Sequence, residues 1–221
     1  MRILLVTLAL TAVVPAYGSI ILFSGDVSVV SPPTSLYPAL QSNTAILGFA
    51  EQQGVLLTTP LTVGITSPGT WVCCSGIPGG TIAAGTTVNS YLLYAAPVSD
   101  QSGEDFREFT GSITFSPGEK IVGIIISYQG LADTDILLGS PTTTYPPAGY
   151  IHGGIQSSDE VIIGPNAQSV YVNLYIADGN SNMIRILTES PEPTAFALLG
   201  SGLMVLALCK WRLRFRRTDG R

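Results

Sequence analysis

Acidic side chains in two short segments are the residues of this chain whose types and spacing could do chemistry. Asp133-Thr134-Asp135 and Asp159-Glu160 each place two carboxylic acids within three residues of sequence. Two carboxyl groups at a fixed separation supply the acid and the base or nucleophile of glycoside hydrolysis. Carboxylates in loops are also the ligands that Ca²⁺ prefers. We therefore predict a candidate calcium site at Asp133, Asp135, Asp159 and Glu160, with a catalytic pair among them as the alternative.

Another segment is similar to the start of a calcium loop. Asp178-Gly179-Asn180-Ser181-Asn182 carries an acid and two amides at alternate positions, and Glu189 stands at the twelfth position. The sixth position is Met183, where such a loop needs glycine for its sharp turn. The flanking segments Val170–Ile176 and Met183–Leu187 consist mostly of β-formers. We therefore predict a β-hairpin with a tight turn at 178–181 in place of a metal loop.

The single histidine adds no signature of an enzyme. His152 precedes Gly153-Gly154, as in some oxyanion loops, but no G-x-S-x-G nucleophile motif accompanies it. A zinc site would need Cys73, Cys74 and His152 with a carboxylate, and the spacing typical of zinc ligands is absent. We therefore predict no enzymatic activity, no catalytic residues, and no cofactor other than the candidate Ca²⁺.

Cys73 and Cys74 are adjacent, which restricts the bonds that they can form. Neighbouring Cα atoms lie about 3.8 Å apart, whereas disulfides prefer more than about 4.4 Å. Free thiols are uncommon in oxidising compartments. A strained disulfide between the two cysteines, an intermolecular bridge and no defined role all remain open.

The charge of the central segment limits its partners. Between Ser19 and Ser190 the only basic residues are Arg107, Lys120 and Arg185, against thirteen Asp and Glu, a formal charge of about −10. The phosphates of a nucleic acid would be repelled by such a surface, so nucleic-acid binding is excluded. Divalent cations and neutral polysaccharide are compatible with it.

Segments rich in Val, Ile, Thr, Tyr and Phe recur through the central segment and predict strands. These segments are Thr44–Ala50, Val55–Thr58, Leu61–Ile65, Thr86–Ala95, Phe109–Phe115, Ile121–Tyr128, Ser169–Ala177 and Asn182–Thr188. Helical periodicity appears only at Leu131–Leu138, enough for one or two turns. We therefore predict an all-β domain over 19–190, an antiparallel two-sheet β-sandwich with jelly-roll-like connections.

The N-terminus has the features of a signal peptide. Met1-Arg2 is positively charged, Ile3–Val14 is apolar, and Ala16 and Gly18 are small residues at the −3 and −1 positions. We predict a signal peptide over 1–18 with cleavage between Gly18 and Ser19. Its partners would be the Sec translocon and signal peptidase.

The C-terminus combines a short motif, an apolar segment and a basic end. The sixteen residues Thr194–Cys209 would rise about 24 Å as a helix, against about 30 Å of bilayer hydrocarbon, so a span needs Trp211 at the interface. We predict a transmembrane helix over 194–211. The residues of the basic stop, which place this end in the cytoplasm, are Lys210, Arg212, Arg214, Arg216 and Arg217.

Pro191-Glu192-Pro193, directly before that helix and the basic tail 210–217, resembles the PEP-CTERM sorting signal of Gram-negative bacteria. The resemblance covers 191–217 and implies that Pro191, Glu192 and Pro193 are recognised by an exosortase, which removes the tail. It also implies an inner-membrane-anchored intermediate, and then a place at the cell surface or in the extracellular matrix. The basic cluster departs from the pattern because Trp211, Leu213 and Phe215 interrupt it.

The central segment is also similar to a recurrent ectodomain of PEP-CTERM proteins, which has no established activity. The segments that carry this likeness are Glu51–Leu57, Ile82–Tyr91, Gly111–Phe115, Leu138–Pro146 and Ile184–Thr188. We expect a structural or adhesive protein, associated with exopolysaccharide and biofilm, with Tyr145, Tyr150 and Trp71 as aromatics for sugar stacking or for packing. The alternatives are a secreted carboxylate-dependent glycoside hydrolase and a calcium-dependent carbohydrate-binding module.

Overall fold

The computed structural model describes residues 20–36, 40–73, 77, 79–98, 106–146, 154–156, 158–177 and 180–189. All of them belong to one compact unit, Tyr17–Ser190. The predicted signal peptide, the sorting motif and the transmembrane helix lie outside the described residues. Within the part of the chain that is described, no helix is long and apolar enough to cross a membrane.

The described residues are mostly β-structure, as the sequence predicts, with one short helix, α1 (Tyr128–Leu138). The strands are β1 (Ile20–Gly25), β2 (Val27–Val29), β3 (Ile46–Ala50), β4 (Val55–Leu56), β5 (Leu61–Val63), β6 (Gly69–Val72), β7 (Gly80–Ile82), β8 (Thr87–Ala95), β9 (Phe106–Phe115), β10 (Lys120–Ile125), β11 (Glu160–Ile163), β12 (Ser169–Ala177) and β13 (Asn182–Glu189).

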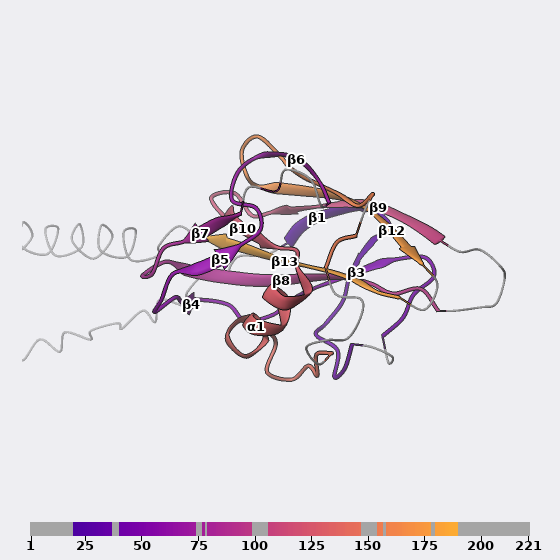
Figure 1. Cartoon of the computed structure of the whole chain (residues 1–221), viewed down its shortest axis with the longest axis horizontal. Coiled ribbons are helices and arrows are strands. Elements are labelled where there is room, and N and C mark those ends of the chain that lie inside the picture. Colours follow the sequence, from indigo (N-terminus) through magenta and orange to yellow (C-terminus); the bar gives the residue numbers. More distant parts are fainter. Residues whose placement is uncertain are drawn as a thin grey trace, which may run out of the picture. The chain divides into compact units, whose positions relative to one another are not determined.

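The strands form two main sheets and a small third one (Figure 1). Sheet A has the order β1-β9-β12-β11-β6, and sheet B has the order β10-β13-β8-β3-β2, with β4 also paired to β8. The pairing of β2 with β3 is parallel, and the other pairs within both sheets are antiparallel. The third sheet consists of β5 and β7 alone.

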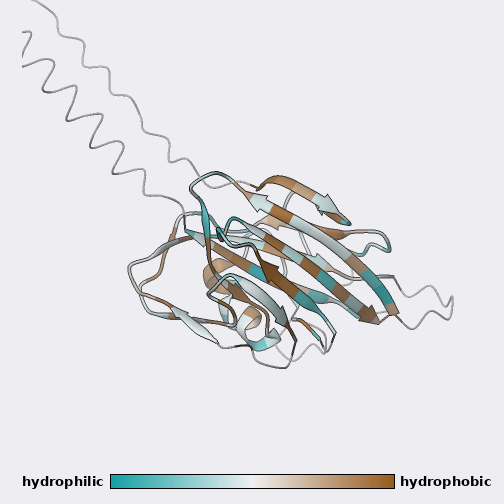
Figure 2. Cartoon of the chain, turned by 90° about the horizontal axis from the view of Figure 1, so that it is seen from above, coloured by the Kyte–Doolittle hydropathy of each residue, from teal (hydrophilic) through white to brown (hydrophobic). Residues whose placement is uncertain are grey.

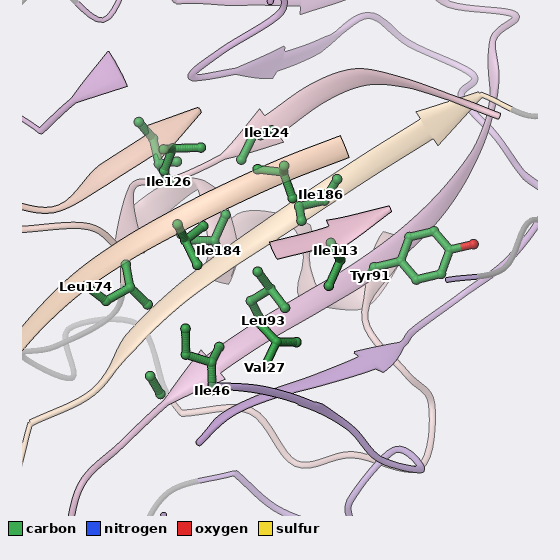
Figure 3. Close-up of a cluster of buried hydrophobic side chains, with 14 of the residues drawn as sticks. Val27, Ile46, Tyr91, Leu93, Ile113, Ile124, Ile126, Leu174, Ile184 and Ile186 are labelled. Carbon is green, nitrogen blue, oxygen red and sulfur yellow. The ribbon is translucent and has the colours of Figure 1, made fainter. Parts of the chain in front are cut away.

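One apolar cluster fills the space between sheets A and B. It draws Ile113, Val172 and Leu174 from sheet A, and Leu93, Ile184 and Ile186 from sheet B. Figure 3 shows several of these side chains together. Because successive side chains of a strand point to opposite faces, only alternate residues of each strand enter this cluster. The two sheets therefore form a β-sandwich-like arrangement.

A second apolar cluster covers the other face of sheet B. Leu92 of β8 and Leu187 of β13 pack there with Val63 and Ile82 of the small sheet and with Leu131 of α1. Sheet B is thus the middle layer, and nearly every residue of β8 and β13 is buried. This position explains why burial does not alternate along β8 and β13, whose polar residues are buried as well.

A glycine permits the close approach of the small sheet. Gly123 lies in β10, and a Cβ atom placed there would lie 2.8 Å from Cδ1 of Ile82. That distance is shorter than real Cβ contacts allow, so the Ile82 side chain would have to shift to admit a larger residue. β10 is thus covered on both faces, since Ile124 belongs to the cluster between the sheets and Ile125 to the cluster on the other face of sheet B.

The eight predicted strand segments all contain strands, although their ends differ by a few residues. The sequence reading missed β1, β2, β6, β7 and β11. β2, β6, β7 and β11 have only three or four residues each, which is a short window for a pattern to show, and β1 is an edge strand of sheet A. α1 is longer than predicted, because Ser127 caps its first turn by accepting a hydrogen bond from the Gly130 N–H at 3.2 Å.

The predicted hairpin between β12 and β13 is wrong. β12 pairs with β9 and β11 in sheet A, whereas β13 pairs with β10 and β8 in sheet B. The two strands therefore face each other across the core, and Leu174 and Ile184 belong to the same cluster. A turn signal between two apolar strands does not distinguish a hairpin from a chain reversal that crosses between sheets.

A buried arginine joins α1 to sheet B. Arg185 of β13 is completely buried, and Nε and Nη2 donate to the two carboxylate oxygens of Glu51 at 2.7 and 2.8 Å. Nη1 donates to the Leu131 carbonyl oxygen at 2.9 Å and to Thr134 Oγ1 at 2.6 Å. The second Nη2 hydrogen reaches Asp135 Oδ1 at 2.8 Å. All five N–H donors of the guanidinium are thereby used.

Two further side chains donate hydrogen bonds to the Glu51 carboxylate. Ser90 Oγ donates to Glu51 Oε2 at 2.6 Å, and Tyr145 OH donates to Glu51 Oε1 at 2.6 Å. The Tyr145 ring also lies under the Arg185 guanidinium, 5.6 Å from its centroid. Burial, and then the Glu51 charge, raise the pKa of Tyr145 well above its usual value, so its hydroxyl stays a donor.

Replacing the buried arginine tests this linkage. We expect Arg185→Met to lower the free energy of unfolding by about 3–5 kcal/mol, because Glu51 would remain buried without its cation. Urea unfolding of segment 19–190, which contains both apolar clusters, measures it through the fluorescence of Trp71. The exposed Lys120 gives the matched control Lys120→Met, with an expected change within about 0.5 kcal/mol.

The double variant Glu51→Gln/Arg185→Met removes both charges, and we expect it to recover part of the lost stability. Equal unfolding free energies for Arg185→Met and Lys120→Met would show that the ion pair does not hold α1.

Candidate functional site

Several predicted functional residues lie outside the described residues. They are the cleavage site Gly18 and Ser19, the sorting motif Pro191, Glu192 and Pro193, the basic stop Lys210, Arg212, Arg214, Arg216 and Arg217, and also Cys74, Tyr150 and His152. The remaining candidates are the four acids of the predicted metal site, Cys73, Tyr145 and Trp71. Their positions can be compared with the predictions.

The predicted metal ligands on α1 are separated from those before β11. Asp133 is exposed, and its Oδ1 accepts a hydrogen bond from Gln129 Nε2 at 2.7 Å. Asp135 pairs with Arg185 on the face of sheet B that α1 covers. Burial raises the pKa of Asp135, while the hydrogen bond from Arg185 lowers it. Both acids thus have partners supplied by the protein itself.

Asp159 is buried on the opposite side of sheet B. Its Oδ2 accepts hydrogen bonds from the Gln156 N–H and Asn182 Nδ2, both at 2.6 Å, and its Oδ1 accepts one from the Tyr175 N–H at 2.7 Å. The two carboxylate oxygens of Asp159 are therefore occupied by the protein's own donors. Asp159 joins the start of β11 to β12 of sheet A and to β13 of sheet B.

The four acids do not meet in space. Asp135 binds Arg185, whose side chain points to the α1 side of β13, whereas Asp159 binds Asn182, three residues earlier on the other side of that strand. In the part of the chain that the structure describes, no group of three or more His, Cys, Asp or Glu side chains could hold a metal ion. The four acids therefore do not form the single site that the sequence predicts.

Cys73 follows β6 and is disulfide-bonded. Its backbone N–H donates to the Asp159 carbonyl oxygen at 2.9 Å, which fixes this segment beside β11. Its sulfur lies 3.3 Å from the carbonyl oxygen of Ile155. The disulfide excludes a free thiol at Cys73 and leaves a structural role.

The predicted stacking aromatics are used for packing. Tyr145 contacts Arg185 and Glu51, and Trp71 packs against the cluster between the sheets while its Nε1 donates to the Ser67 carbonyl oxygen at 3.4 Å. Of the two predicted roles, sugar stacking and packing, the structure favours packing for both residues.

Sheet A instead presents a different set of aromatic and polar side chains. In β12 and β9, alternate residues are buried against sheet B, and the residues between them face away from it. The bands of alternating hydropathy along the strands are visible in Figure 2. We define the outer face of sheet A by the outward residues of its three central strands, which are Phe106, Glu108, Thr110, Ser112, Thr114, Glu160, Ile162, Ser169, Tyr171, Asn173, Tyr175 and Ala177.

The strand register places these outward residues opposite one another on neighbouring strands. Tyr171 lies opposite Ser112 on one side and Ile162 on the other, and Asn173 lies between Thr110 and Glu160. Tyr171 has 36% of its surface exposed. Tyr171 and Tyr175 are four residues apart on one strand, so their rings stand about 13 Å apart along it.

One end of this face is organised by hydrogen bonds. Tyr175 OH donates to Glu108 Oε1 at 2.8 Å, and Asn173 Nδ2 donates to the same oxygen at 3.0 Å. The bond to Glu108 raises the pKa of the Tyr175 hydroxyl. Asn173 Oδ1 is buried and has no hydrogen-bond partner among the described residues. The hydrogen bonds thus hold the side chains of Glu108, Asn173 and Tyr175 in place.

The outer face of sheet A carries acids and no described base. Glu108 and Glu160 lie on it, whereas Lys120 and Arg185 belong to sheet B, and Arg107 occupies the alternate position of β9 opposite Ile176. The face therefore suits a neutral polar ligand and repels polyanions. Sequence reasoning missed this face, although the alternation Tyr171-x-Asn173-x-Tyr175 in a predicted strand is a visible signal for it.

Comparison with protein families, curated proteins and solved structures found no significant match. The function is therefore inferred from the geometry of the chain itself.

The buried carboxyl of Asp159 predicts a pH dependence of stability. Burial raises its pKa from 3.8 to about 6, although the Gln156 and Tyr175 N–H groups lower it. The folded state thus binds this proton more tightly than the unfolded state does. Its contribution to stability is fully present below about pH 4 and is lost as the pH rises to about 6, a change of about 3 kcal/mol.

We expect Asp159→Asn to remove this part of the pH dependence, measured by urea unfolding between pH 4 and 7. At pH 7 the unfolding free energy of the variant should be lower by about 1–3 kcal/mol. Both oxygens of Asp159 accept hydrogen bonds, and in asparagine an NH₂ group would replace one of them and face an N–H donor. The exposed Asp133 provides the control Asp133→Asn, which should keep the wild-type pH profile. A carboxyl resonance of Asp159 that titrates near pH 4 would contradict the prediction.

Proposed function

We propose that the chain is an exported, non-catalytic surface or matrix protein that binds neutral polysaccharide on the outer face of sheet A. The observation that carries this proposal is the row of Tyr171, Asn173 and Tyr175 on one strand of an open sheet surface. The other aromatic candidates and the buried acids are occupied by packing and by hydrogen bonds.

The chemistry of that row matches a sugar chain. A pyranose ring has apolar C–H faces and a rim of hydroxyl groups, so it needs flat aromatic surface together with donors and acceptors. Tyrosine supplies an apolar ring with a polar tip, and its two rotatable bonds limit the entropy lost on binding. Tyr175 is already oriented by Glu108, which lowers that loss further. On the neighbouring strand β9, Ser112 lies opposite Tyr171 and Thr110 lies opposite Asn173, and both add hydroxyl groups.

The charge of the chain narrows the class of polysaccharide. Uronic-acid, sulfated or phosphorylated chains would meet Glu108 and Glu160 without a described cation on the face. A neutral glycan carries no such penalty. Neutral polysaccharide is thus the ligand class that the face fits best.

Binding without turnover is favoured over hydrolysis. A glycosidase needs two carboxyl groups flanking the scissile bond, one of them with access to water. Asp135 is paired with Arg185, and Asp159 is buried and accepts three hydrogen bonds. On the outer face of sheet A, a hydrolase would have to use Glu108 and Glu160 as its two acids.

The location of the protein is inferred from its ends. The signal peptide 1–18, the motif Pro191-Glu192-Pro193 and the basic tail support export, anchoring in the inner membrane and processing by an exosortase. Removal of the tail would release an acidic domain at the cell surface or into an exopolysaccharide matrix. For the two sheets we further propose jelly-roll-like connections, a fold used by lectin domains.

Retention on polysaccharide tests the binding face. We expect segment 19–190 to be retarded in gels that contain a neutral β-glucan or dextran, and not in gels that contain alginate. Tyr171→Ala and Tyr175→Ala should each weaken retention about tenfold, because each removes a stacking surface. The matched control is Tyr128→Ala, since Tyr128 is an exposed tyrosine on α1, beyond the other face of sheet B.

The same samples show whether the ligand is cleaved. Release of reducing ends that disappears in Glu108→Gln or Glu160→Gln would overturn the non-catalytic assignment. Retention that requires calcium and is lost with a chelator would favour the calcium-dependent alternative. Loss of retention in Tyr128→Ala as well would contradict a site on sheet A.

A further inference from the structure

We propose that two copies of this chain associate by pairing their β1 strands, so that their A sheets become one continuous sheet. β1 is the terminal strand of sheet A and pairs only with β9 among the described strands. Among the described residues nothing pairs with its opposite edge, so the backbone N–H and C=O groups there are in line for another strand, which is the requirement for adding a strand to a sheet.

The side chains of β1 are unusually apolar for an edge. Ile21, Leu22 and Phe23 are 54%, 63% and 50% exposed, and Val29 on the adjacent β2 is 40% exposed. Edge strands that must stay single usually carry Lys, Pro or inward-pointing charge. β1 has none of these residues. Its register shifts between Ile20 and Leu22, an irregularity of the kind that can also protect an edge, and the pairing is regular from Leu22 to Gly25.

The edge strand β10 of sheet B is paired with another segment of the chain. The Gly64 and Ile65 N–H groups donate to the Ile124 carbonyl oxygen at 2.9 and 3.2 Å, and the Ile124 N–H donates back to Ile65 at 2.8 Å. The edge strand β10 therefore has partners where β1 has none described. The chain thus protects one sheet edge and leaves another exposed.

Charge repulsion limits where a second copy could bind. The domain carries about −10 between Ser19 and Ser190, so two copies repel each other over most of their surface. β1 has no charged residue, and Asp26, which follows it in the sequence, accepts a hydrogen bond from the Thr110 N–H at 2.8 Å. β1 is therefore a place where two like-charged copies can approach.

Two β1 strands are also self-complementary. An antiparallel pair related by a two-fold axis near Leu22 brings Leu22 against Leu22 of the second copy and sets Ile21 near Phe23 of that copy. Each contact then occurs twice. The apolar side chains that one copy leaves in water would be buried by the other.

This pairing has a consequence that rests on the proposed function. In an antiparallel pair, opposed residues point to the same side of the sheet. The outer faces of both A sheets would then lie on one side of the dimer, with two tyrosine rows available to a single polysaccharide chain. Bivalent attachment would strengthen binding without any new contact to sugar.

Sedimentation velocity tests the pairing without any polysaccharide, so its outcome is independent of the binding face. We expect the full chain in a mild detergent, and segment 19–190 in buffer, to form dimers in the micromolar range. Leu22→Lys should raise the dimer dissociation constant about tenfold or more, because two ammonium groups would face each other at the axis.

The matched control is Leu56→Lys, at a leucine of β4 that is 57% exposed. It should dimerise as the wild type does. Hydrogen exchange supplies a second readout, because pairing should slow exchange of the β1 amides as the protein concentration rises. A monomer at all concentrations, or a dimer that Leu22→Lys does not weaken, overturns the proposal.

Discussion

The pairing of Arg185 with Glu51 is the constraint on which the arrangement of layers depends. Burying two charges is costly, and an ion pair offsets that cost only when its remaining donors and acceptors are also satisfied. Here each N–H of the guanidinium has an acceptor, and three of these acceptors belong to α1. α1 contributes few buried apolar residues of its own, namely Leu131 and Leu138. The arginine therefore holds in place a helix that apolar packing alone would hold weakly.

Because α1 and the small sheet cover one face of sheet B, and sheet A covers the other, the functional surface is left to sheet A. Its inner face is committed to the core, and its outer face is not covered by any described element. Tyr171, Asn173 and Tyr175 stand on that outer face, and β1 forms one of its edges. Both proposed sites, the polysaccharide-binding face and the β1 edge, therefore lie on sheet A, because sheet B is covered on both faces.

The candidate site shows how far acidic residues can be interpreted from their spacing alone. Asp135 and Asp159 look equivalent in the sequence, since each has an acid within two positions. In the structure one is a partner of a buried guanidinium, and the other is a buried acceptor that joins the two sheets. The contacts that separate them come from β12 and β13, which lie more than ten residues away along the chain. Local spacing carries no information about such partners.

The sequence by itself determined the all-β class, the eight main strand segments and the acidic charge, because β-propensity and composition are properties of single residues and short windows. It did not determine which strands pair. The turn after β12 was predicted as a hairpin, yet the chain crosses there from sheet A to sheet B. Sheet membership is decided by which apolar faces can be buried together, and that choice involves residues far apart in the chain. Only the tertiary structure therefore shows that Arg185 is a core residue, that Tyr145 is a packing residue and that β1 is an exposed edge.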